Sequence, residues 1–375
     1  MSQTENHALT TQPQAAGSGR RVLAALSGGV DSAVAAALLV EAGYEVIAIS
    51  MLLAGTADGH EGSCCSIDDF QDARRVAEQL DIPYYVLNLK DAFQSRVIDV
   101  FSEEYLRGRT PNPCLLCNRD LKFDLLWQRA RELDATYVAT GHYARIHYDA
   151  DTARYQLWRG TDRAKDQSYF LFTLSQAQLA RTLFPVGQLT KAQVRDKADA
   201  LGLRIAHKPE SQDICFVPDG NYARFLEQRL SPERFRSGEV VDQTGQQLGS
   251  HGGIHRFTIG QRRGLGIGGL AQPVYVSNID AHTGRVTVGT KDQLRTPGLY
   301  AKDVSWVAGD QSQELRAEVK IRYRHPPIPA RIVPGPDATA TVWFQHGCPG
   351  VSPGQAVVFY AGDHVLGGGW IEGGV

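Results

Sequence analysis

A glycine-containing turn between an apolar run and an alanine-rich segment constrains the fold more than any other feature of this chain. Residues 21–26 (Arg-Val-Leu-Ala-Ala-Leu) have the length and apolar character of a buried parallel strand. Residues 31–41 are rich in alanine and leucine and stop before Gly43, so they predict a helix. The turn at residues 27–29 (Ser-Gly-Gly) lets the backbone approach an anion at the positive end of the helix dipole. The sequence therefore predicts a polyphosphate site at a strand-to-helix turn.

This turn differs from the phosphate loop of kinase-type enzymes. Such a loop ends in Gly-Lys-Ser or Gly-Lys-Thr, and its lysine holds the terminal phosphates. Here residues 30–32 are Val-Asp-Ser. Transfer of the terminal phosphate of a nucleotide is therefore disfavoured.

Apolar strand-like segments alternate with helical segments in the first part of the chain. The predicted strands are residues 44–50, 84–89 and 136–140, and the predicted helices are residues 69–80, 92–106 and 121–133. This alternation predicts an α/β fold with a doubly wound parallel sheet. Ligands of such sheets bind beyond the carboxyl ends of the strands, where the 27–29 turn, Met51 and residues 140–143 would converge.

Composition limits the classes of protein that fit the chain. With 375 residues, 42% of them hydrophobic and 21% charged, it is long enough for two or three soluble domains. We expect a disordered polar tail at residues 1–19, no membrane span, no signal peptide and a cytoplasmic location. The net charge of -2 means that a surface for nucleic acid must be local.

The cysteines are the second informative feature of the sequence. They are Cys64, Cys65, Cys114, Cys117, Cys215 and Cys348. Because nothing indicates export, we expect reactive or metal-binding thiols rather than a disulfide framework. Cys114 and Cys117 form a Cys-x-x-Cys after an extended segment at residues 110–113 (Thr-Pro-Asn-Pro), and residues 118–127 read as a helix. Cys117 would then lie near a helix N-terminus, where the dipole lowers the pKa of a thiol.

Three interpretations of these thiols remain open at the level of sequence. Cys114, Cys117 and Cys215 can hold a 4Fe–4S cluster with one open iron, or act as a redox pair with a sulfur carrier, or be inert buried thiols. A zinc site is disfavoured because no fourth ligand is evident. Cys64, Cys65 and Cys348 are expected to be packing or accessory thiols.

The hexad at residues 27–32 resembles the pyrophosphate loop of ATP pyrophosphatases, which split ATP into AMP and pyrophosphate. The whole chain from about Arg20 resembles the tRNA-specific 2-thiouridylases. The motifs that carry this resemblance are residues 108–113 (Gly-Arg-Thr-Pro-Asn-Pro), 117–119 (Cys-Asn-Arg), 140–143 (Thr-Gly-His-Tyr), 165–170 (Lys-Asp-Gln-Ser-Tyr-Phe), 183–187 (Leu-Phe-Pro-Val-Gly), 214–216 (Ile-Cys-Phe), 260–266 (Gly-Gln-Arg-Arg-Gly-Leu-Gly), 322–324 (Arg-Tyr-Arg) and 353–355 (Pro-Gly-Gln).

The resemblance implies three domains: a catalytic pyrophosphatase domain at 20–217, a small central tRNA-binding domain at 218–294 and a C-terminal β-barrel at 295–375. The sequence agrees, because short alternating strands are expected at residues 274–279, 285–288, 304–307, 318–323, 338–344 and 356–360. Residues 326–329 (Pro-Pro-Ile-Pro) and 367–369 (Gly-Gly-Gly) are expected to be loops.

The resemblance also implies an activity, ATP-dependent 2-thiolation of the wobble uridine of tRNA through an O2 adenylate, with ATP and Mg²⁺ as cofactors. The implied ATP-binding residues are Ala25, Leu26, Ser27, Gly28, Gly29, Val30, Asp31, Ser32, Met51 and Gly141. Asp31 would help to hold Mg²⁺. The implied contacts to the target base or tRNA are Asn112, Pro113, Cys114, His142, Lys165, Asp166, Gln167, Arg322, Tyr323 and Gln355.

For sulfur transfer, the resemblance implies that Cys215 carries a persulfide and that Cys117 is the nucleophile, leaving a Cys117–Cys215 disulfide. The sulfur would come from a cysteine desulfurase or a sulfur-relay protein, and the substrates would be tRNAs of the Lys, Glu and Gln type. This chain departs from well-known bacterial members, which carry aspartate where it has Cys114. The departure keeps a cluster route with Cys114, Cys117 and Cys215 as ligands open beside the persulfide route.

Two further functional classes are compatible with the sequence. The chain can be another ATP pyrophosphatase with an amine nucleophile, in which case Cys215 would be dispensable. It can also be a tRNA-binding or iron–sulfur scaffold with a regulatory nucleotide loop, which would form no AMP with any RNA.

Overall fold

The computed structural model describes residues 19–53, 67–209, 214–217, 219–269 and 272–375. Most of the predicted 1–19 tail lies outside these ranges, as do Cys64 and Cys65. Within the described ranges, no helix combines the length and the apolar character needed to cross a bilayer.

The first domain is built on five parallel strands in the order β3-β2-β1-β4-β7. The bounds of its strands are β1 Arg21–Ala25, β2 Glu45–Leu52, β3 Tyr84–Asn88, β4 Tyr137–Ala139 and β7 Thr182–Leu183. The strands predicted at 44–50, 84–89 and 136–140 are all present, with ends that differ by at most two residues.

Helices cover both faces of this sheet. Their bounds are α1 Val30–Glu41, α2 Ile67–Gln79, α3 Lys90–Phe93, α4 Asp99–Leu106, α5 Pro113–Leu116, α6 Asp124–Glu132, α7 Gln176–Leu179 and α8 Lys191–Ala200. On one face, Val22 and Ala24 of β1 share a core with α1, α2 and α8. On the other face, Leu23 packs with Leu126 of α6. The predicted doubly wound α/β fold is therefore confirmed.

Two π-helical segments join neighbouring helices of this domain. Gln94–Ile98 connects α3 to α4, and Cys117–Phe123 connects α5 to α6. The second helical run begins at Pro113, with the Asn112 side chain accepting a hydrogen bond from the Cys114 backbone N–H. The sequence prediction, which placed residue 113 in an extended segment and began the helix at 118, was wrong because proline fits the first position of a helix.

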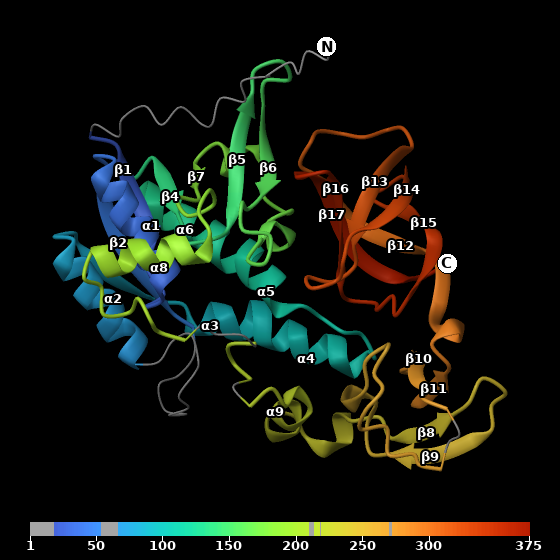
Figure 1. Ribbon diagram of the computed structural model, residues 1–375. Coiled ribbons are helices and arrows are strands. Elements are labelled where there is room, and N and C mark those ends of the chain that lie inside the picture. The colour runs from blue at the N-terminus through green and yellow to red at the C-terminus, as the bar shows by residue number, and fades with distance from the viewer. Residues whose placement is uncertain (1–18, 54–66, 210–213, 218, 270–271) are drawn as a thin grey trace.

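The central domain follows α9 (Tyr222–Arg229) and contains a four-stranded mixed sheet in the order β10-β11-β8-β9. Its strands are β8 Gly238–Val241, β9 Gln247–His251, β10 Tyr275–Asp280 and β11 Arg285–Gly289. In Figure 1 this domain lies below the C-terminal domain and beside α9. The exact domain bounds at 217 and 294 stay a prediction.

The C-terminal domain is a closed six-stranded antiparallel barrel in the order β12-β15-β14-β13-β16-β17, because β17 also pairs with β12. Its strands are β12 Arg295–Trp306, β13 Leu315–Lys320, β14 Ile328–Pro334, β15 Ala340–Pro349, β16 Ala356–Ala361 and β17 His364–Gly374. The predicted barrel is confirmed.

Two segments predicted as loops are wholly or partly strands of this barrel. Pro326 and Pro327 precede β14 as predicted, whereas Ile328 and Pro329 begin it. Pro329 lies in β14 opposite Glu318 of β13, one residue before the pairing of β14 with β15 begins at Ala330. Residues 367–369 lie inside β17, and a Cβ on Gly368 would come within 2.8 Å of the Phe172 ring. The glycines of β17 thus mark close packing inside the barrel rather than a turn.

The first domain and the barrel share one sheet. The hairpin of β5 (Ala144–Asp149) and β6 (Arg154–Arg159) adds to β17, with Trp158 opposite His364. Arg109, next to α4, also forms ion pairs with Glu104 and with Glu372 of β17. These contacts attach the barrel to the first domain.

Candidate active site

The turn at residues 27–29 connects the carboxyl end of β1 to the start of α1, as the sequence predicted. Gly28 has a φ of +74°, and Gly29 precedes the first residue of α1. The Ser32 hydroxyl accepts from the Ser27 backbone N–H at 3.1 Å and donates to the Gly29 carbonyl at 3.0 Å. The loop is thus folded back on the first turn of α1, whose backbone N–H groups have no partner within the helix.

The loop is also seated on α2. A Cβ on Gly28 would lie 2.3 Å from the backbone oxygen of Asp69, so no other side chain fits this position without displacing α2. Lys208 Nζ donates to the Gly28 carbonyl at 3.1 Å and to Asp69 and Asp72 at 2.7 and 2.6 Å. These contacts hold the loop against α2.

Asp31, the second residue of α1, is held by two donors from distant parts of the chain. Lys191 Nζ lies 2.7 and 2.8 Å from its two carboxylate oxygens. The Tyr143 hydroxyl donates to Oδ1 at 2.7 Å. Because a carboxylate offers about four lone-pair sites and three are used here, Asp31 retains room for one bond to a metal ion. That fits Mg²⁺, which takes one or two carboxylates together with the phosphates of its nucleotide.

The end of β4 presses against the start of α1. A Cβ on Gly141 would lie 2.7 Å from the Ser32 backbone nitrogen, so the close approach requires glycine. Tyr143, which follows, is 2% exposed, and its backbone exchanges two hydrogen bonds with Gln167. The structure therefore links Gln167, through Tyr143, to Asp31.

The Cys-x-x-Cys lies on one helical run with its two thiols in different surroundings. Cys114 is exposed, whereas Cys117 is 9% exposed and begins the π-helical segment. Burial by surrounding protein raises the pKa of the Cys114 thiol, and Lys122 opposes this. Because Cys114 is an exposed residue, the effect is weaker than in a closed core. Within the described residues, the buried Asn118 Oδ1 beside Cys117 has no hydrogen-bond partner.

The structure brings Cys215 to the same region as Cys117. Cys117 belongs to an apolar cluster with Leu53, Phe93 and Leu116, and the half-buried Cys215 packs against this cluster, as does Met51. Cys114, Cys215 and Cys348 are free thiols. Burial raises the pKa of Cys348 to about 11, which agrees with a packing role in the barrel.

The thiols do not form a metal-ligand set as they are placed here. Across the part of the chain that the structure describes, no group of three or more His, Cys, Asp or Glu side chains is arranged to hold a metal ion. Cys114, Cys117 and Cys215 as arranged therefore do not fit an iron–sulfur cluster.

Two predicted RNA contacts in the first domain are buried side chains with internal partners. His142 is 8% exposed, its Nδ1 lies 2.6 Å from the Thr140 hydroxyl, and burial lowers its pKa well below the ordinary value. Asp166 is 6% exposed and accepts from the backbone N–H groups of Gly160 and Ser168. Lys165, beside it, is half-buried. A contact of these residues with RNA stays a prediction.

The three predicted contacts from the barrel lie at domain boundaries. Arg322 Nη2 donates to Ile259 of the central domain at 2.9 Å and to Gly350 and Ser352 of the barrel. Gln355 Nε2 donates to the Thr110 carbonyl at 2.8 Å. Tyr323 lies against Phe170, with ring centroids 4.6 Å apart. Arg322 and Gln355 thus join domains in this structure, and their contact with tRNA stays a prediction.

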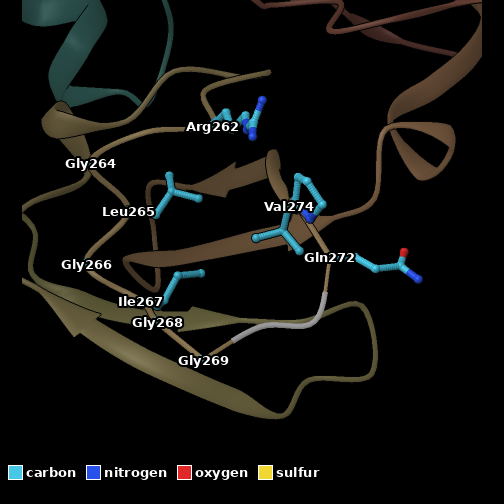
Figure 2. Close-up of a pocket in the computed structure, with 10 residues that line it drawn as sticks. Arg262, Gly264, Leu265, Gly266, Ile267, Gly268, Gly269, Gln272 and Val274 are labelled. Carbon is cyan, nitrogen blue, oxygen red and sulfur yellow. The ribbon is translucent and has the colours of Figure 1, made fainter.

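An open hollow of about 470 Å³ lies in the central domain, away from the nucleotide loop. Arg262, the glycine-rich stretch 264–269 and residues 272–274 line it (Figure 2). None of the predicted site residues lines this hollow.

Sequence reasoning missed Lys191 and Lys208 as partners of the nucleotide loop. Lys191 lies 160 positions from Asp31, and Lys208 lies 180 positions from Gly28. No local pattern marks either residue, because each contact depends on how α8 and the segment after it pack beside α1 and α2.

The parallel sheet and the turn at residues 27–29 define a nucleotide-binding α/β protein with a HUP domain. A central domain and a barrel domain follow it in the chain. Three family models match the chain: the tRNA methyl transferase HUP domain at 20–219, the tRNA methyl transferase PRC-barrel domain at 223–290 and the aminomethyltransferase β-barrel domain at 296–371. The tRNA-specific 2-thiouridylase of Geotalea uraniireducens is 55% identical, covering 94% of this chain and 95% of that protein. The 2-thiouridylase of Geobacter metallireducens is 53% identical, covering 94% and 97%. The chain belongs to the family of tRNA-specific 2-thiouridylases.

Proposed function

We propose that this protein is an ATP-dependent sulfurtransferase that replaces O2 of the wobble uridine of tRNA with sulfur and releases AMP and pyrophosphate. The observation that carries the proposal is 55% identity to a tRNA-specific 2-thiouridylase over 94% of the chain. The loop at 27–32 supports it, because its glycines and the start of α1 form an anion site without a kinase-type lysine.

The first step is adenylation of the base. O2 of uridine attacks the α-phosphorus of ATP, the bond between the α- and β-phosphoryl groups breaks, and pyrophosphate leaves with the electron pair while the N3 proton is lost. Ser27, Ser32 and the N–H groups of the turn bind phosphate oxygens. Asp31 would hold Mg²⁺, which neutralises phosphate charge when bound. The remaining proposed ATP contacts are Ala25, Leu26, Gly28, Gly29, Val30, Met51 and Gly141.

The second step is sulfur transfer. Cys215 carries a persulfide; the Cys117 thiolate attacks its inner sulfur, a Cys117–Cys215 disulfide forms and hydrosulfide is released. Hydrosulfide attacks C2 of the adenylated base, and AMP leaves with the former O2. A thiol reductant then restores both cysteines. Their shared apolar cluster supports the pairing of these two residues.

The target base must leave the anticodon stack to reach these groups. Asn112, Pro113 and the exposed Cys114 start the helical run that carries Cys117, so they are the proposed contacts to the flipped base. We further propose tRNAs of the Lys, Glu and Gln type as substrates, a cysteine desulfurase or relay protein as sulfur donor, and a cytoplasmic location.

The test is nucleoside mass spectrometry of tRNA that lacks wobble thiolation, after incubation with the protein, ATP, Mg²⁺ and a persulfide donor. We expect 2-thiouridine at the wobble position, and none when ATP is omitted. If no thiouridine forms with any of the three tRNA types, the proposal is wrong.

A further inference from the structure

The helical run at residues 113–123, which carries Cys117, lies between two apolar clusters. On one face, Leu115 packs in a cluster with side chains of the barrel strands β16 and β17. On another face, Cys117 lies in the apolar cluster around Phe93, against which Cys215 packs. The position of this run therefore sets where the Cys117 thiol lies relative to Cys215.

Trp370 of β17 packs against both of these clusters. Its ring centroid lies 6.2 Å from that of Phe172, with an angle of 62° between the ring planes. Its backbone pairs with β12 and β16, so the barrel fixes the point from which the indole extends. The other described members of the Phe93 cluster come from residues 51–125 and 215–225. Trp370 is thus the side chain that the barrel contributes to the surroundings of the two thiols.

Arg119, two residues after Cys117, joins the helical run to this indole. Its guanidinium carbon lies 5.6 Å from the centre of the Trp370 ring, within the range of a cation–π contact. The Asp120 carboxylate accepts hydrogen bonds from Arg119 Nε at 2.6 Å and from Nη2 at 3.0 Å, which orients the guanidinium plane. The indole and the run are therefore joined by a directional contact as well as by apolar packing.

The segment that follows Cys117 depends on such support. Residues 117–123 are π-helical, a geometry that is rare in proteins. Conversion of one π-helical turn to an α-helical turn removes one residue from the turn, and one residue corresponds to a rotation of roughly 100° about the helix axis. Because Cys117 begins the segment, such a rotation would move its thiol relative to Cys215. Thiol–disulfide exchange requires the two sulfur atoms to meet, so the pairing depends on what holds the segment in place.

We propose that Trp370 is a positioning residue for sulfur transfer. Its indole, with the Arg119 guanidinium over the ring, holds the helical run so that the Cys117 thiolate reaches the inner sulfur of the Cys215 persulfide. The inference rests on the proposed function, because it concerns the pairing of these two thiols. It gives the barrel a part in the sulfur chemistry through one side chain, apart from any contact that the barrel makes with RNA.

The first measurement is the equilibrium of the full chain with glutathione, which needs neither tRNA nor ATP. Each Cys117–Cys215 disulfide that forms reduces one glutathione disulfide to two glutathione thiols, and peptide mass spectrometry identifies the bond. We expect Trp370→Ala to lower the equilibrium constant for disulfide formation at least tenfold, which corresponds to about 30 mV in reduction potential. Trp370→Phe keeps a ring for Arg119 and Phe172, so its constant should stay within threefold of the wild type.

Trp343→Ala is the matched control. Trp343 lies on β15 of the barrel and has the Arg331 guanidinium over its ring at 6.0 Å. It is not among the described members of either cluster. We therefore expect its equilibrium constant to stay within twofold of the wild type.

The second measurement separates the two chemical steps. Pyrophosphate release with tRNA, ATP and Mg²⁺ but without a sulfur donor reports adenylation, and 2-thiouridine formation with a persulfide donor reports both steps. We expect Trp370→Ala to change the first rate less than threefold and to lower the second at least tenfold. If Trp370→Ala does not fold, Arg119→Met, which removes the cation and keeps the indole, decides by the same two measurements.

Two outcomes distinguish failure of the inference from failure of the proposed function. A disulfide equilibrium constant or a thiolation rate within threefold of the wild type in Trp370→Ala would overturn the inference, even if the free energy of unfolding falls, because a purely structural side chain would behave in that way. A wild type that forms no Cys117–Cys215 disulfide would overturn the sulfur-transfer step of the proposed function, and the inference with it.

Discussion

Cys117 shows what sequence can and cannot establish about a single residue. Its Cys-x-x-Cys spacing and the helix after it were visible in the sequence, and they indicated a reactive thiol near a helix N-terminus. The structure places Cys117 deeper, after the first turn that Pro113 begins, and 9% exposed. Its packing with Cys215, 98 positions away, could not be predicted from local pattern, because it depends on the tertiary cluster around Phe93.

Cys117→Ala and Cys215→Ala are each expected to abolish 2-thiouridine formation while ATP binding changes less than threefold, because both thiols lie in the apolar cluster around Phe93, which includes no residue of the 27–32 loop. Nucleoside mass spectrometry and nucleotide titration measure the two properties. Cys348→Ala is the matched control and should retain thiolation, since its thiol is buried in the barrel with a pKa of about 11. Normal thiolation in either of the first two variants would contradict the assigned roles.

At the scale of elements, the loop before α1 was predicted well because its requirements are local. A glycine with positive φ and a helix N-terminus are both encoded within a few residues. The strands β14 and β17 were missed for the opposite reason. Pro329 and the glycines 367–369 look like loop residues, and only the neighbouring strands and Phe172 show why the barrel needs them.

Gly28→Ala is expected to lower the free energy of unfolding by about 3 kcal/mol or more and to abolish ATP binding. The substitution is destabilising because Gly28 has a positive φ and because the new Cβ would lie 2.3 Å from the Asp69 backbone oxygen. Gly43→Ala is the control, because Gly43 shares the positive φ (+81°) but has open space around its Cβ, so about 1 kcal/mol is expected. Urea unfolding measures both; equal costs would mean that contact with α2 does not constrain the loop.

At the scale of the whole molecule, partly buried polar contacts join the three domains. Arg322 links the central domain to the barrel, and Gln355 links the barrel to the segment before Cys114. Three domains followed from the resemblance stated on sequence, but these contacts did not, because each connects residues far apart in the chain. The barrel therefore helps to position the helix that carries Cys117.

Arg322→Met is expected to lower the free energy of unfolding by about 1–3 kcal/mol, because it removes the guanidinium donor of the Ile259 and Gly350 carbonyls and leaves them only the longer bonds from the Ser352 hydroxyl, at 3.4 and 3.3 Å. Arg324→Met, at an exposed neighbouring position, should change it by less than about 0.5 kcal/mol. Chemical unfolding tests the difference. If Arg322 also contacts a tRNA phosphate, Arg322→Met should lower the number of ions released on tRNA binding by about one. The slope of tRNA affinity against salt concentration measures this number.

The protein should lose stability as the pH falls from about 6.5 toward 5. Burial lowers the pKa of His142, His147, His251, His255 and His364 in the folded state. Below about pH 6.5 the unfolded chain therefore binds protons that the folded chain does not, which favours unfolding by up to about 1.4 kcal/mol per histidine and pH unit. Urea unfolding at pH 7.5 and 5.5 measures this, and equal stabilities would contradict it.

The central claim is that O2 of the wobble uridine leaves as part of AMP. It is tested most directly with tRNA whose wobble uridine carries ¹⁸O at O2, incubated with ATP, Mg²⁺ and a persulfide donor. Mass spectrometry of the nucleotide product follows the label. The account predicts one ¹⁸O atom in the phosphate of AMP for each 2-thiouridine formed. Thiouridine together with unlabelled AMP would show that the base is not activated as an O2 adenylate and would contradict the account.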